Sequence, residues 1–194
     1  MVSPAATVET RRRIVDAAAR RALLVTLGKT TVEEIAAEAG VSRATVYRWF
    51  PGGREEIVAA LVDSQLDAFF SDLASHVRDA PDFERLLVRG LMRAHAGMVD
   101  HRLLQRVLDV EPELVLPELQ RRSRSLVGDI ADFLRPYLTT TELADDLDVD
   151  EACRYLARLT LSFIGNPGSW DLTDEAETTR LVRTQFLAGL VRRP

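Results

Sequence analysis

The chain has 194 residues, 46% of them hydrophobic, and a formal net charge of −5 at pH 7. This composition favours a packed globular protein over a disordered one, and the single cysteine excludes an intrachain disulfide. No apolar run is long enough to span a membrane, and residues 1–10 lack the pattern of a secretory signal, so we expect a cytoplasmic protein with no membrane partner.

The charge is distributed unevenly along the chain. Residues 1–60 contain nine Lys and Arg and seven Asp and Glu side chains, whereas the remainder contains 16 basic and 23 acidic ones. An acidic whole argues against nonspecific nucleic-acid binding over the entire surface. A basic first part joined to an acidic remainder indicates that only the first part meets phosphate.

Apolar residues recur at helical spacing throughout, which predicts an all-α fold. We expect a first helix over residues 8–24, then a short helix after the capping box Thr31-Val32-Glu33-Glu34. Gly40 ends that short helix, because glycine adopts the left-handed conformation at no steric cost. Ser42 begins a third short helix that ends near Phe50.

Six further helices bring the expected total to nine. Pro117 is expected in the first turn of the seventh helix, and Pro136 is expected to end or kink it. A second capping box, Asp148-Val149-Asp150-Glu151, begins the eighth. The six predicted ranges are residues 54–77, 81–98, 103–108, 117–136, 150–164 and 174–191.

Residues 31–50 read TVEEIAAEAGVSRATVYRWF and place two short helices on either side of a tight turn, Gly40-Val41-Ser42. The two helices are expected to pack on each other and on the first helix through Ile35, Ala36, Val41 and Val46, which have the spacing for this. This is the plan of a helix-turn-helix, whose second helix enters the major groove of DNA.

The second helix of this pair carries side chains suited to DNA contact. Arg43 can reach a guanine edge with two hydrogen bonds, and Thr45 can contact a thymine methyl group or a phosphate. Tyr47 and Arg48 can hold backbone oxygens, and the indole N–H of Trp49 can donate to a phosphate. The alternative is a helix-turn-helix inside an ordinary helical protein, in which Arg43 and Arg48 are only solvated.

Two flanking residues complete the candidate DNA-binding set. Thr31 adds a donor at a helix N-terminus, where the dipole favours an anion. Arg54 begins the next helix, where the positive end of the helix dipole repels its positive charge. A nearby DNA phosphate would account for a cation at this position.

The stretch TTVEEIAAEAGVSRATVYRWFPGGREEIVAAL, with RIVDAA at residues 13–18, resembles the DNA-binding region of TetR-family transcriptional regulators. The resemblance covers about residues 10–62 and implies a nine-helix homodimer, usually a repressor. It also implies that the residues matching Thr31, Arg43, Thr45, Tyr47, Arg48 and Trp49 face DNA.

The chain departs from the family pattern in two places. Gly52-Gly53 adds one residue before Arg54, which takes the place of the family's usual lysine, and no aromatic residue stands near the end of the first helix. Farther along, residues 104–108, followed by Glu111-Pro112-Glu113 and Pro117, loosely resemble a subgroup associated with quorum-signal degradation genes.

We therefore expect a DNA-binding domain over residues 1–53 and a ligand-binding and dimerisation domain over residues 54–194. The helices at 150–164 and 174–191 are expected to pair two protomers, and the helix at 54–77 to connect ligand to DNA. On binding a small-molecule effector, the protein would release a palindromic double-stranded operator. We expect the effector to be mostly apolar with one polar end. Its candidate contacts are Met92, His95, Met98, His101, Tyr155 and Phe163.

Other interpretations remain beside this one. A ligand-independent DNA-binding regulator would share the motif and differ in having a filled second domain. Gly28-Lys29-Thr30 lacks the glycine of a phosphate-binding loop, because Leu23 stands there. His76, His95 and His101 lack the spacing of a helical metal site, so we expect no metal. No Ser–His–Asp or paired-carboxylate arrangement is legible either, so we expect no cofactor and no enzyme activity. A metal-assisted hydrolase is the enzymatic alternative.

Overall fold

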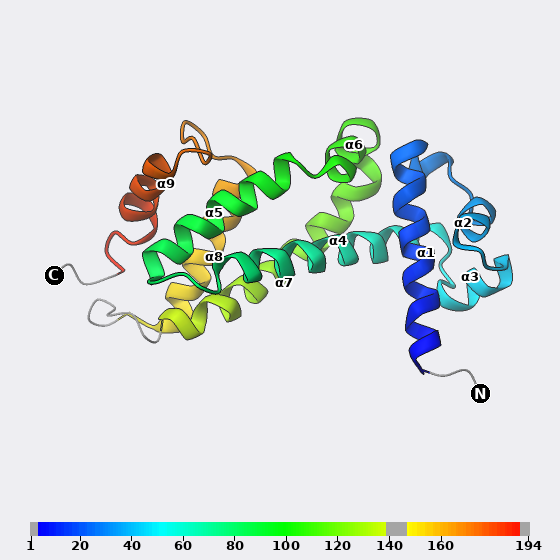
Figure 1. The fold of residues 1–194 in the computed structure, drawn as a ribbon, viewed down its shortest axis with the longest axis horizontal. Helices are drawn as coiled ribbons and strands as arrows, with labels where there is room; N and C mark the ends of the chain where they lie inside the picture. Colours follow the sequence, from blue (N-terminus) through cyan, green and yellow to red (C-terminus); the bar gives the residue numbers. More distant parts are fainter. Residues whose placement is uncertain (1–3, 139–146, 191–194) are drawn as a thin grey trace. The chain divides into compact units, whose positions relative to one another are not determined.

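The computed structural model describes the backbone of residues 4–138 and 147–190, and within these ranges the chain is helical with no strand (Figure 1). The predicted all-α class is confirmed. Nine α-helices are present in this part of the chain, with a 3₁₀ turn (η1) and a π-helical segment (η2) in addition. In chain order they are α1 (Pro4–Leu24), η1 (Leu27–Lys29), α2 (Val32–Ala39), α3 (Arg43–Trp49), α4 (Arg54–Val77), α5 (Phe83–Val99), α6 (Arg102–Val110), α7 (Pro112–Leu138), α8 (Val149–Gly165), α9 (Glu175–Leu181) and η2 (Val182–Phe186).

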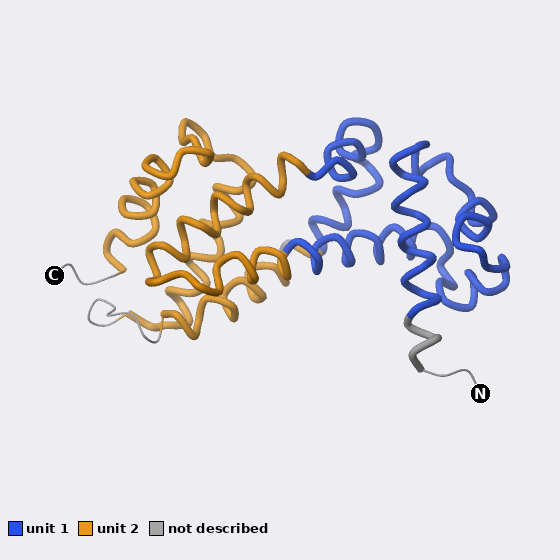
Figure 2. Tube along the Cα trace, viewed as in Figure 1, with its two compact units in different colours: residues 1–69, 101–121 blue, residues 70–100, 122–194 orange. Residues whose placement is uncertain are grey.

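The chain forms two compact units (Figure 2). Unit 1 contains residues 1–69 and 101–121, and unit 2 contains residues 70–100 and 122–194. Unit 1 is thus larger than the predicted DNA-binding domain, since it also includes most of α4, all of α6 and the start of α7. The functional division at residue 53 stays a prediction.

The core of unit 1 is built by α1, α2, α3 and the first half of α4, with α6 and α7 added to it. Ile14, Ala17 and Ala18 lie on one face of α1 and are fully buried, as their spacing predicts. Val46 on α3 and Phe50 directly after it are also fully buried. Burial of such side chains stabilises a fold by about 1.5–3 kcal/mol each, so the inner face of α3 is held firmly.

In unit 2, α5 contacts α8, α9 and η2. Leu91 on α5, Leu156 on α8 and Phe186 in η2 are buried in its core. At the surface, Arg183 forms two hydrogen bonds of 2.9 Å with the carboxylate of Glu84. Polar pairs and apolar burial together fix the C-terminal elements on α5.

The start of α7 differs from the prediction. The helix begins at Pro112, where the missing N–H of proline costs nothing, and Pro117 lies inside it. Glu111 alone, with an irregular backbone, separates α6 from α7. Pro136 lies inside α7, whose described part runs to Leu138, so this proline does not end the helix, and the alternative of a kink there stays a prediction.

The last predicted helix also differs, because α9 ends at Leu181 and continues as the π-helical η2. The hydroxyl groups of Thr178, Thr179 and Thr184 donate to backbone carbonyls four residues earlier. Such back-bonding competes with regular helix geometry and bends helices. Among the described helices, none is both long and apolar enough to cross a bilayer.

Candidate nucleic-acid interface

Hydrogen bonds at the helix ends define the α2–α3 pair. The Thr31 hydroxyl accepts from Glu34 N at 3.2 Å and Thr31 N donates to the Glu34 carboxylate at 2.8 Å, so the predicted capping box is confirmed. Gly40 ends α2 with φ +65°, and the Ser42 hydroxyl caps α3 by accepting from Thr45 N. These local signals fix the turn between the two helices.

Arginines on α1 hold α2 in place. Arg13 donates to the carbonyl of Ala39 at 2.6 Å, at the C-terminal end of α2 where free carbonyls attract a cation. Arg20 pairs with Glu38 at 2.7 Å, and Arg21 pairs with Glu34 at 2.9 Å. Much of the basic charge of residues 1–60 therefore serves the scaffold and does not lie on a free basic surface.

The outer face of α3 carries Arg43, Tyr47 and Arg48, all exposed. Arg43 pairs with Glu33 of α2 at 2.7 Å, and its guanidinium lies 5.4 Å from the centre of the Tyr47 ring. A hydrogen bond with Tyr47, followed by the attraction of Glu33, raises the pKa of Arg43. Thr45 is half-buried, with its hydroxyl 2.9 Å from that of Ser42.

Trp49 and Arg54 lie in surroundings that the sequence did not indicate. Trp49 packs against the core of unit 1, and its indole N–H is buried without a hydrogen-bond partner. A phosphate contact would therefore require the ring to move. Arg54 donates to the carbonyl of Gly28 at 2.5 Å, so its position at the start of α4 has an explanation within the chain.

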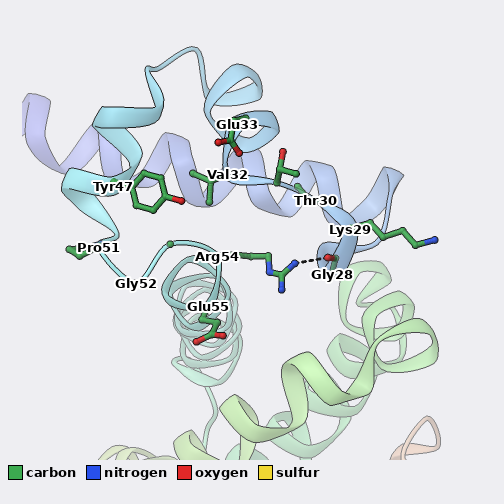
Figure 3. Close-up of a pocket in the computed structure, with 12 residues that line it drawn as sticks. Gly28, Lys29, Thr30, Val32, Glu33, Tyr47, Pro51, Gly52, Arg54 and Glu55 are labelled. Atoms are coloured by element: carbon green, nitrogen blue, oxygen red, sulfur yellow. Dashed lines mark hydrogen bonds between the residues drawn. The ribbon is translucent and has the colours of Figure 1, made fainter.

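An open groove of about 500 Å³ lies beside α3 (Figure 3). Figure 3 shows the Tyr47 ring on one side, the Arg54 guanidinium reaching across to Gly28, and the Lys29 side chain extending outward. The groove is lined by residues 28–33, Tyr47 and residues 51–55. Two cations, Lys29 and Arg54, line the groove together with two carboxylates, Glu33 and Glu55. A cation that extends outward, such as Lys29, suits an anion such as a DNA phosphate.

Sequence reasoning missed Lys29 as a candidate contact. In the sequence, Lys29 stands only in a segment that lacks the glycine of a phosphate-binding loop. The available signal is its place two residues before Thr31, a predicted DNA contact.

The six predicted effector contacts are divided between the two units. Met92, His95 and Met98 lie on α5 in unit 2, whereas His101 belongs to unit 1. His101 caps α6, because its Nδ1 accepts from Leu104 N at 3.0 Å. The structure thus gives His101 a structural role and does not bring all six residues into one unit.

The other two predicted contacts lie on α8 and face η2. The Tyr155 hydroxyl donates to the carbonyl of Gln185 at 3.3 Å, and the ring centres of Phe163 and Phe186 are 5.5 Å apart. Both side chains therefore join α8 to η2. Within the described residues, no three His, Cys, Asp or Glu side chains gather in a way that could hold a metal ion.

Comparison with known proteins places residues 14–61 in the family model described as bacterial regulatory proteins of the tetR family. The HTH-type transcriptional regulator SrpR of Pseudomonas putida is 28% identical over 144 residues, which are 73% of this chain and 67% of SrpR. The matched region includes α2, α3 and the groove-lining turn before α4.

Solved structures share the fold over nearly the whole chain. The TetR family repressor AlkX from Dietzia sp. strain DQ12-45-1b has a TM-score of 0.63 and 20% identity, covering 96% of this chain and 97% of AlkX. The R. erythropolis repressor QsdR, from the TetR family, has a TM-score of 0.61 and 18% identity, covering 97% and 98%. These likenesses show the fold alone, so the resemblance to a quorum-signal subgroup stays a prediction. Residues 14–61 thus match the tetR family of bacterial regulatory proteins, and the α2–α3 pair within them has the geometry of a helix-turn-helix.

Proposed function

We propose that the protein is a dimeric transcriptional repressor that binds a palindromic operator through α3 and leaves it when a small molecule binds. The observation that carries this proposal is the exposed face of α3, which carries Arg43, Tyr47 and Arg48, with Tyr47 also lining an open groove. A short helix that is buried on one side and polar on the other suits entry into a major groove.

Base and phosphate contacts have different sources in this proposal. Arg43, in the first turn of α3, reads a guanine, and Thr45 contacts a neighbouring base or phosphate. Tyr47, Arg48 and Lys29 hold the DNA backbone, and Thr31 contributes from the N-terminus of α2. Since phosphate contacts supply most of the affinity, binding falls steeply as salt rises.

Two protomers pair through α8 and α9 in this proposal, as is usual for the family. Two-fold pairing would set the two recognition helices about 34 Å apart, one turn of DNA, and the operator would be a near-palindrome. Light scattering tests this directly. A dimer at micromolar concentration supports the pairing, and a monomer contradicts it.

The proposed effector binds in unit 2 and favours a conformer that fits DNA poorly. The effector can weaken DNA binding only by the difference between its binding free energies for the two conformers. This coupling free energy is typically about 1–3 kcal/mol. Met92, His95 and Met98 on α5 remain the proposed contacts. The biodegradation of n-alkanes, in which AlkX is implicated, agrees with a mostly apolar effector. A thermal-shift screen of fatty acyl compounds, acyl lactones and aromatic drugs tests it, and no response would favour ligand-independent regulation.

The DNA-binding proposal is tested by selecting duplexes from a random-sequence library with the wild-type chain. We expect enrichment of a near-palindrome. Tyr47→Ala with Arg48→Ala should weaken binding to that duplex by at least about 100-fold, or about 2.7 kcal/mol, through lost backbone contacts. The control is Arg78→Ala, an exposed arginine of unit 2, which should bind like the wild type. Undiminished binding by the double variant would refute the assignment of α3.

A further inference from the structure

Glu111 is the one charged residue classed as buried among the side chains that the structure describes, with 9% of its surface exposed. It stands between α6 and α7, within unit 1. A buried carboxylate is costly unless it is hydrogen-bonded, so its partners indicate what it stabilises.

Both carboxylate oxygens of Glu111 accept hydrogen bonds from the connection between α1 and α2. Leu27 N donates to one oxygen at 2.5 Å, and Gly28 N donates to the other at 2.7 Å. These amides are the first two of the 3₁₀ turn η1, where N–H groups lack partners within the helix. The Glu111 carboxylate thus supplies hydrogen-bond acceptors for two successive backbone N–H groups that have none within the helix.

The glycine at position 28 leaves room for Glu111. A Cβ atom there would lie 2.6 Å from the Glu111 carboxylate oxygen, so the carboxylate would have to shift to admit a side chain. On the same side of unit 1, Arg106 of α6 donates to the carbonyl of Ala22 near the end of α1, at 3.0 Å. Hydrogen bonds from Arg106 and to Glu111 therefore hold the last turn of α1 and the η1 turn that follows it.

The residues held by Glu111 border the groove beside α3. The carbonyl of Gly28 accepts from Arg54, and Gly28 to Thr31 form one wall, from which Lys29 extends (Figure 3). We propose that Glu111 is a positioning residue for DNA binding, holding this wall in the geometry that meets a backbone phosphate. This inference rests on the proposed DNA-binding function.

The test uses the duplex selected by the wild-type chain and the variant Glu111→Ala. We expect its Kd to rise about tenfold, or about 1.4 kcal/mol. Because the loss concerns a phosphate contact, a scrambled duplex should be weakened by the same factor, and the slope of log K against log salt should fall by about one. A merely destabilised protein would not change that slope.

Glu113→Ala is the matched control, since Glu113 is an exposed glutamate two residues away and its removal changes the net charge equally. It should leave Kd and slope unchanged. Hydrogen exchange should show faster exchange at the Leu27 and Gly28 amides in Glu111→Ala only. If Glu111→Ala does not fold, Glu111→Gln keeps one acceptor oxygen and should show a smaller loss with the same change of slope.

The proposal is overturned if a folded Glu111→Ala or Glu111→Gln binds both duplexes with wild-type affinity and slope. Failure of the underlying function would look different, because the wild-type chain would then select no duplex at all. In Gly28→Ala, a methyl group placed against the carboxylate should reproduce the loss seen in Glu111→Ala.

Discussion

Arginine side chains are used differently in unit 1 and unit 2. In unit 2 several of them join helices at the surface, as in the pairs of Arg183 with Glu84 and Arg135 with Asp150, and Arg78 is exposed beyond the end of α4. In unit 1 they are divided, because Arg13 and its neighbours on α1 hold α2, whereas Arg48 on α3 is exposed. We therefore expect the position of each basic residue, and not the number of basic residues, to identify the surface that meets DNA.

The largest expected effect concerns stability in unit 2. Leu91→Ala should lower the free energy of unfolding by about 2–5 kcal/mol, because it removes a buried side chain from α5 and leaves a cavity. Urea denaturation measures this. Affinity for the selected duplex, measured where the variant is folded, should stay near the wild-type value, since the residues proposed to contact DNA are untouched.

Leu24→Ala in unit 1 is the control, because 71% of Leu24 is exposed. Its unfolding free energy should change by less than about 0.5 kcal/mol. Equal losses in the two variants would mean that burial does not distinguish these positions.

A smaller effect is expected from Glu33→Gln at the start of α2. The wild-type carboxylate pairs with Arg43 and must release it before Arg43 can reach a base. Exposed pairs are worth about 0.2–1 kcal/mol, so the selected duplex should bind about 1.4- to 5-fold more tightly. Fluorescence anisotropy at constant salt measures the change.

Glu55→Gln is the control for Glu33→Gln, because Glu55 is an exposed carboxylate that lines the same groove. It removes the same negative charge without freeing Arg43 from its ion pair. If it tightens binding as much as Glu33→Gln does, the pairing of Arg43 has no special part in affinity.

The smallest effect concerns acid stability in unit 1. Hydrogen bonding from the Thr31 backbone N–H, the largest cause, lowers the pKa of Glu34 below its ordinary value of 4.5. Its stabilising contribution is therefore full above pH 4.5 and is lost as the pH falls through the folded-state pKa. The stability difference between wild type and Glu34→Gln should shrink over that range in thermal unfolding scans. A difference that grows on acidification would contradict the sign.

The elements that sequence could predict depend on neighbours in the chain. The Thr31 capping box, the left-handed Gly40 and the burial of Val46 follow from local spacing, so α2 and α3 lie where expected. Glu111 was missed because its partners are 83 and 84 residues away. No local pattern reveals such a pairing.

Tertiary surroundings that the sequence does not reveal also decide the roles of His101 and Trp49. Both carry groups that bind ligands or phosphates, and both were predicted to do so. In the fold, His101 caps α6 and the Trp49 indole N–H is buried. A polar aromatic residue can serve packing or binding, and only its tertiary surroundings decide between them.

The central claim, that α3 reads duplex sequence, is tested most directly by replacing Arg43 with alanine and substituting each base pair of the selected duplex in turn. We predict that the variant loses about 1–3 kcal/mol of discrimination at one guanine position in each half-site, with preferences elsewhere retained. An unchanged preference at every position would contradict the account.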